Sequence, residues 1–254
     1  MGARAFAGGS SLFWTLVFMG VVDLAVPIQE TPGFYESYLL ETGWGVLYTF
    51  LVGAAFVSLA VRPGMVMPLT QVGIVAVCVA VTAVAAGSWI QLVPGLLLGL
   101  NCYVFLRLGR YRRVRGNWYP PRLDPLVGAL ALGLVPLGVL FAVDMVNGFR
   151  EGRPPLDDDT WYIDHWPMQA AFALAAAGVA VAVAAGVRNR SSGTAVSAGC
   201  VAVAVGWFGY WSATYPNHAG SAGEAGGTGL IGWAAAFVVV VAWRLARRRT
   251  PSPR

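Results

Sequence analysis

Long apolar segments recur along the whole of this 254-residue chain. A helix of about 20 apolar residues crosses the ~30 Å hydrocarbon core of a bilayer. An open strand cannot do so, because lipid offers its backbone no hydrogen-bonding partners. A hydrophobic fraction of 57% and a charged fraction of 11% agree with this interpretation. The sequence therefore predicts an all-α protein, a polytopic bundle of transmembrane helices.

About eight spans are expected. The first contains Asp23 and lacks a small-residue cleavage site, so we expect a helix of the mature protein and not a cleaved signal peptide. The predicted spans cover about 11–28, 43–61, 65–86, 89–108, 126–147, 165–187, 194–214 and 228–246.

Arginine supplies every basic residue, since the chain has no lysine. One side of the predicted spans carries Arg4, Arg62, "RLGRYRRVRGNWYPPR", Arg188, Arg190 and "RLARRR". Only Arg150 and Arg153 fall on the other side, which holds both histidines and all acids except Asp124. The positive-inside rule then predicts a plasma-membrane protein with both termini in the cytoplasm. Because topology accounts for the arginines, no nucleic-acid partner is expected.

The two halves of the chain resemble each other. "VVDLAVP" ends the first span and "AVDMVNG" ends the fifth. From Asp23 to Trp44 is 21 residues, and from Asp144 to Trp166 is 22. We predict two four-helix halves in tandem, 1–108 and 126–246, related as a parallel repeat. A basic cytoplasmic linker, 109–125, joins them, and a basic tail, 247–254, follows. Coincidence of loop lengths is the alternative.

Asp23 and Asp144 are the first candidate functional residues. Each lies within an apolar segment, where a carboxylate is costly and usually faces a bundle interior or a wet cavity. The alternative is a carboxylate that meets the headgroup region near a helix end.

A second candidate group opens the sixth span in "WYIDHWPMQAA". Asp164 suits a helix N-cap. His165 could carry a proton, with Gln169 one turn further on to orient it, or it could be an interfacial histidine.

His218, in "TYPNHAG", is the other histidine. With His165 and nearby aspartates it could in principle bind a metal, but no spacing resembles a ligand motif, so no metal is expected. The absence of lysine excludes Schiff-base chemistry, and no cofactor is expected. The three cysteines are expected to be buried thiols.

Aromatic residues crowd the same side of the spans. They include Trp44, Trp166, Trp207, Tyr210 and Trp211. An interfacial belt is one interpretation, and a wall that binds a cationic ligand or intermediate is the other.

Two resemblances accompany these patterns. "DHWPMQAAFAL" and "YPNHAGS" resemble small multi-pass membrane proteins of actinobacteria. "GWGVLY" followed by "MPL" is similar to the start of membrane-bound terpene cyclases. Those cyclases then carry an Asn-x-x-Trp-Glu element with a catalytic glutamate. This chain reads "TQVGIVAVCV" there, without an acid, so no residue is carried over.

Three functions remain open at this point. The first is an enzyme or binding protein for a lipid-like or isoprenoid molecule, with Asp23 and Asp144 as acids and His165 as partner. The second is a small transporter with Asp23 and Asp144 on a central path. The third is a non-catalytic accessory protein. The bilayer is the expected partner in each case, and the oligomeric state is not predicted.

Overall fold

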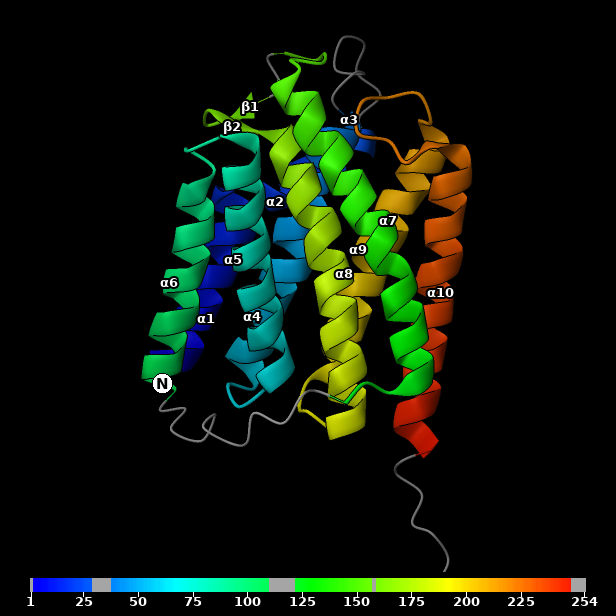
Figure 1. The fold of residues 1–254 in the computed structure, drawn as a ribbon. Helices are drawn as coiled ribbons and strands as arrows, with labels where there is room; N and C mark the ends of the chain where they lie inside the picture. The colour runs from blue at the N-terminus through cyan, green and yellow to red at the C-terminus, as the bar shows by residue number, and fades with distance from the viewer. Residues whose placement is uncertain (1, 29–37, 110–121, 157–158, 248–254) are drawn as a thin grey trace, which may run out of the picture.

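The computed structural model describes residues 2–28, 38–109, 122–156 and 159–247, which form a bundle of helices (Figure 1). In chain order the helices of the first half are α1 (Gly2–Leu12), the π-helix η1 (Phe13–Val17), α2 (Gly20–Ala25), the 3₁₀ helix η2 (Val26–Ile28), α3 (Tyr38–Val46), the π-helix η3 (Leu47–Gly53), α4 (Ala54–Val61), α5 (Val66–Ala86) and α6 (Leu92–Leu108). The second half contains α7 (Pro125–Arg150), a hairpin of β1 (Asp159–Thr160) and β2 (Ile163–Asp164), α8 (His165–Asn189), α9 (Thr194–Thr214) and α10 (Gly223–Arg247).

Six helical segments in the described residues are long and apolar enough to cross a membrane. They are 39–61, 66–86, 125–150, 165–189, 194–214 and 223–247. The prediction of an all-α, polytopic membrane bundle is therefore confirmed.

The two other predicted spans take different forms. The first starts earlier than expected, at Gly2, and bends by 52° between Val17 and Gly20, where Met19 has a φ of 64°. The Trp44 indole donates a hydrogen bond to the carbonyl of Phe18 at this break, so a neighbouring helix satisfies a backbone group that the break releases. The fourth is α6, a shorter apolar helix of 17 residues.

The bundle has two distinct ends. Figure 1 shows the start of α1 and the end of α10 at one of them, together with the α4–α5 and α8–α9 turns. Arg62 follows α4 there, Arg188 is in the last turn of α8, and Arg244 is in the last turn of α10. We call this the basic end. The opposite end carries the β1–β2 turn and is called the hairpin end.

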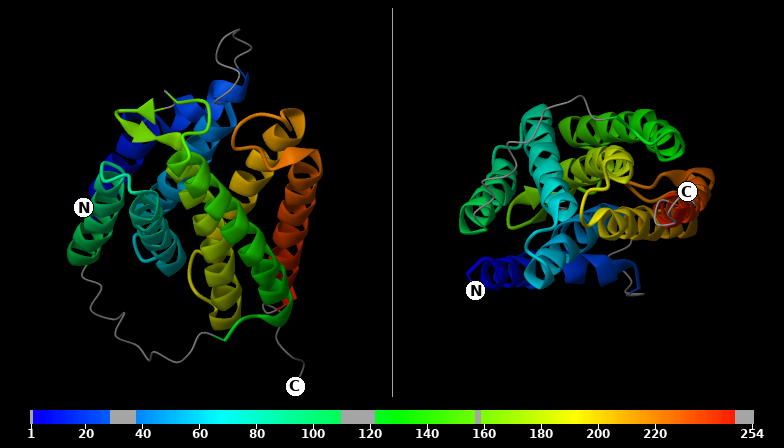
Figure 2. Two further views of the ribbon diagram at one scale, coloured as in Figure 1. Left: turned by 45° about the horizontal axis from the view of Figure 1, so that its top comes forward. Right: turned by 90° about the horizontal axis from the view of Figure 1, so that it is seen from below.

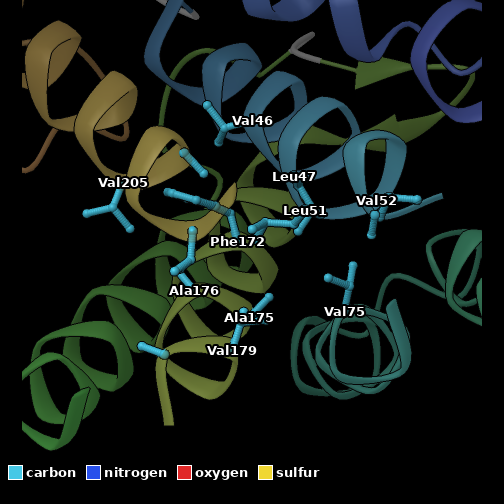
Figure 3. Close-up of a cluster of buried hydrophobic side chains, with 14 of the residues drawn as sticks. Val46, Leu47, Leu51, Val52, Val75, Phe172, Ala175, Ala176, Val179 and Val205 are labelled. Carbon is cyan, nitrogen blue, oxygen red and sulfur yellow. The ribbon is translucent and has the colours of Figure 1, made fainter. Parts of the chain in front are cut away.

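Helix α8 forms the centre of the bundle and packs against α3, α5, α7 and α9. Its alanines and Phe172 lie against Leu47 and Leu51 of η3 and Val205 of α9 (Figure 3). Small side chains along α8 allow these helices to approach closely, which is how helices pack in lipid, where hydrophobic burial gives little drive to association.

Polar side chains stabilise the π-helix η3. A π-helix shifts the pattern of backbone hydrogen bonds and leaves carbonyls available to other donors. The Gln71 amide of α5 donates to the carbonyls of Leu51 at 2.8 Å and Phe50 at 3.4 Å. The Ser11 hydroxyl of α1 donates to the carbonyl of Gly53 at 3.0 Å. The irregular segment thus exchanges helical hydrogen bonds for bonds to its neighbours.

The tandem repeat stays a prediction. The predicted linker, 109–125, and the tail, 247–254, lie mostly outside the described residues.

Candidate functional site

Asp23 and His165 lie together in the interior near the hairpin end. The His165 Nε2 atom is 4.0 Å from the Asp23 Oδ2 atom, and the two side chains are 3% and 6% exposed. Thr160 of β1 shares a hydrogen bond of 3.2 Å with the same Nε2 atom. The pair therefore joins three separate elements: the bent first segment, the β-hairpin and the start of α8.

An aromatic cluster borders this pair. The Trp44 and His165 rings are 5.1 Å apart in an edge-to-face arrangement. Phe18 stacks on Trp44 at 5.0 Å, and Tyr48 stacks on Trp14 at 5.2 Å. Sequence analysis identified Trp44 but missed Thr160 and Phe18, since no spacing pattern links these segments.

Glycines allow the helices around the pair to approach. A Cβ atom on Gly45 would lie 2.3 Å from the Leu24 amide nitrogen and 2.7 Å from the Asp23 carbonyl carbon. A Cβ atom on Gly43 would overlap the Gln169 side chain. The Gln169 amide donates to the Gly220 carbonyl at 2.8 Å and so links α8 to the loop before α10.

Asp144 has a very different setting. Its side chain is 57% exposed, and its Oδ1 atom accepts a hydrogen bond of 2.8 Å from the Arg153 guanidinium. Arg153 also donates to Glu151 at 2.9 Å. Hydrogen bonds to Asp144 and then to Glu151 raise the pKa of Arg153 above its ordinary value. Asp144 is thus part of an exposed ion-pair network, while Asp23 is buried beside a histidine.

A groove with a volume of about 660 Å³ runs along the bundle beside Asp144. Buried residues of α8 and α9 form its floor, including Phe172, Ala176 and Phe208. One wall is α7, from Leu134 to Asp144, and the other is α10, from Ala225 to Trp233. Among the described residues, Asp144 is the only charged one that lines it.

The walls of the groove are held together toward the basic end by polar contacts between α7 and α10. The Trp233 indole of α10 donates to the Leu130 carbonyl of α7 at 3.0 Å. Below that contact, Arg244 binds both carboxylate oxygens of buried Asp124. Figures 1 and 2 show α7 and α10 close together at the basic end and separating toward the hairpin end. Two polar contacts therefore hold the walls together on one side only.

The other predicted aromatic residues lie on α9 and form a ladder with Tyr215 and His218, which follow it. Trp207 contacts Trp211 at 5.9 Å, Trp211 stacks on Tyr215 at 5.8 Å, and Tyr215 contacts His218 at 4.9 Å. The Tyr215 hydroxyl donates to the Pro27 carbonyl at 3.4 Å. Tyr210 contacts Trp211 and is 53% exposed. The ladder reaches the bent first segment through η2.

Asp164 and Trp166 lie at the start of α8. Asp164 is the N-cap residue of α8, as predicted, although its side chain makes no capping hydrogen bond. Trp166 is buried against Gly148 of α7. Within the described ranges, no three His, Cys, Asp or Glu side chains are grouped so as to hold a metal ion.

The fold defines the class of the protein: a polytopic helical membrane protein. No family model, curated protein or solved structure matches the chain.

Proposed function

We propose that this protein binds a lipid-like molecule, whose hydrocarbon chain lies in the groove between α7 and α10. The observation that supports this proposal is the groove itself, which has a volume of about 660 Å³ and is lined almost entirely by apolar side chains. Ligand sites typically have volumes of about 300–1,000 Å³, so this space is large enough for a substantial part of an amphiphile.

The dimensions of the groove fit one leaflet of a bilayer. The ten residues of α7 between Leu134 and Asp144 rise about 15 Å, half of a ~30 Å hydrocarbon core. Asp124 and Asp144, 20 residues apart on α7, are separated by about 30 Å. This spacing supports a placement of both ion pairs near headgroup level, with the groove in the leaflet at the hairpin end.

The distribution of arginines supports an orientation with the basic end in the cytoplasm and the hairpin end outside. Arg62, Arg188 and Arg244 lie at the basic end, so the positive-inside rule favours that end in the cytoplasm of a bacterial-type plasma membrane. The groove then lies at the level of the outer leaflet.

Gly229 offers a direct test. A Cβ atom there would meet nothing within 4 Å, and Gly229 lines the groove, so Gly229→Leu fills the space without a backbone clash. Gly232 on the same helix also has open space and does not line the groove, so Gly232→Leu is the matched control. Both variants and the wild type would be purified in mild detergent, and lipids that stay bound would be quantified by native mass spectrometry.

We expect Gly229→Leu to reduce retained lipid at least about tenfold, because a leucine side chain occupies the place of the hydrocarbon chain. Gly232→Leu should retain lipid as the wild type does. Equal retention by wild type and both variants would refute the proposal, provided all three elute as monodisperse species.

A further inference from the structure

Asp144, the one charged residue among the described residues that line the groove, indicates the chemistry of the ligand's polar end. We infer that the groove selects an amphiphile with an ammonium-bearing headgroup, such as an aminophospholipid, whose ammonium group contacts Asp144. This inference rests on the proposed function and names its ligand class.

The carboxylate of Asp144 is available for such a contact. Arg153 bonds its Oδ1 atom, and among the described residues none donates a hydrogen bond to Oδ2. The side chain is 57% exposed while it lines the groove. An ammonium donor can therefore reach Oδ2 without displacing Arg153, and a charge-assisted hydrogen bond would form there.

The position of the carboxylate matches the geometry of a lipid. Among the α7 residues that line the groove, Asp144 is the last toward the hairpin end, and the apolar residues Phe141 and Gly138 lie about one and two turns further toward the basic end. Arg153 lies next to Asp144 but does not line the groove. A headgroup that carries both an ammonium and a phosphate could then place the ammonium beside Asp144 and the phosphate beside Arg153.

Glu151 supplies a matched control. Both acids bond Arg153, at 2.8 and 2.9 Å, and both side chains are similarly exposed, at 57% and 59%. Only Asp144 lines the groove. Each of the variants Asp144→Asn and Glu151→Gln removes one negative charge beside Arg153. If a headgroup preference comes from the groove, only Asp144→Asn should change it.

The experiment measures competition between two lipids with identical acyl chains. Phosphatidylethanolamine, which carries an ammonium, and phosphatidylglycerol, which does not, would be added in equal amounts to delipidated full-length protein and counted by native mass spectrometry. We expect the wild type and Glu151→Gln to favour phosphatidylethanolamine about threefold, the size of one partly screened ion pair. Asp144→Asn should show no preference.

The outcomes separate the two proposals. A wild type without preference, or an Asp144→Asn variant that keeps it, overturns the headgroup inference. If Gly229→Leu still lowers the binding of both lipids, the proposed function stands in that case. If Gly229→Leu leaves the binding of both lipids unchanged, the groove does not hold the chain, and both proposals fail.

Discussion

Asp23 and Asp144 occupy corresponding places in the sequence, each near the end of an apolar segment and about 20 residues before a tryptophan. The structure gives them opposite environments. Asp23 is buried 4.0 Å from His165, and Asp144 is exposed and bonded to Arg153. The surroundings of each carboxylate decide this difference in exposure. Neighbouring segments bury Asp23 beside His165, and the turn after α7 places Arg153 beside Asp144 at the surface. Similar local sequence therefore does not imply a similar role.

The largest expected effect separates the two acids directly. Asp23→Ala should lower the free energy of unfolding by about 3 kcal/mol, because it removes one member of a buried polar pair. Asp144→Ala should shift the unfolding temperature by less than about 2 °C, because water solvates both partners of an exposed pair. Thermal unfolding in one detergent would compare them, and equal effects would contradict the contrast.

The close packing behind Asp23 gives the second prediction. Gly45→Ala should destabilise the protein by about 2 kcal/mol, because the new Cβ atom meets the backbone of Leu24, which cannot rotate away. Gly73 of α5 has nothing within 4 Å of its Cβ position, so Gly73→Ala should be neutral or stabilising. Unfolding titrations in mixed micelles would measure both, and a neutral Gly45→Ala would show that α2 is loosely packed.

The third prediction concerns the two tryptophans that open the second and sixth spans. Trp44→Phe removes the hydrogen bond to the Phe18 carbonyl and should cost about 1 kcal/mol. The Trp166 Nε1 atom has no hydrogen-bond partner among the described residues, so Trp166→Phe loses no hydrogen bond and should cost less. The same unfolding assay tests this order, and a larger loss for Trp166→Phe would reverse it.

The smallest expected effect concerns pH. The pKa of Arg153 is raised by Asp144 and Glu151, so the guanidinium binds its proton more tightly in the folded state. That contribution is complete below the ordinary pKa of arginine and is lost only as the pH rises through the higher folded value. Arg153→Gln should therefore leave the shape of the stability profile between pH 6 and pH 8 unchanged. Profiles of both proteins by thermal unfolding would test this, and a changed slope in the variant would count against it.

Hydropathy located the helices well, and it could not give their irregularities. At the bend near Met19 and in the π-helix η3, backbone carbonyls accept hydrogen bonds from Trp44 and Gln71 of distant segments. No local sequence pattern predicts these contacts. The groove was also beyond prediction. The small residues Ala225, Gly226 and Gly229 are visible in the sequence, but only the separation of α7 from α10 makes space beside them.

The candidate residues show the same division. Sequence analysis proposed Asp23 as an acid with His165 as its partner and named Trp44 among the aromatic residues, and the fold brings these three together. It selected Asp144 as an intramembrane acid and missed its partner Arg153. Arg153 is nine residues further along the chain, and only the turn after α7 brings it beside Asp144.

By itself, the sequence determined that this protein is a bundle of membrane-crossing helices, since the length and apolarity of a segment suffice for that conclusion. The tertiary structure alone decided which acid is buried and which is exposed, and where a groove lies. The physical reason is that burial, pairing and empty space are relations between segments that are distant along the chain. Hydropathy is a property of one segment and does not contain them.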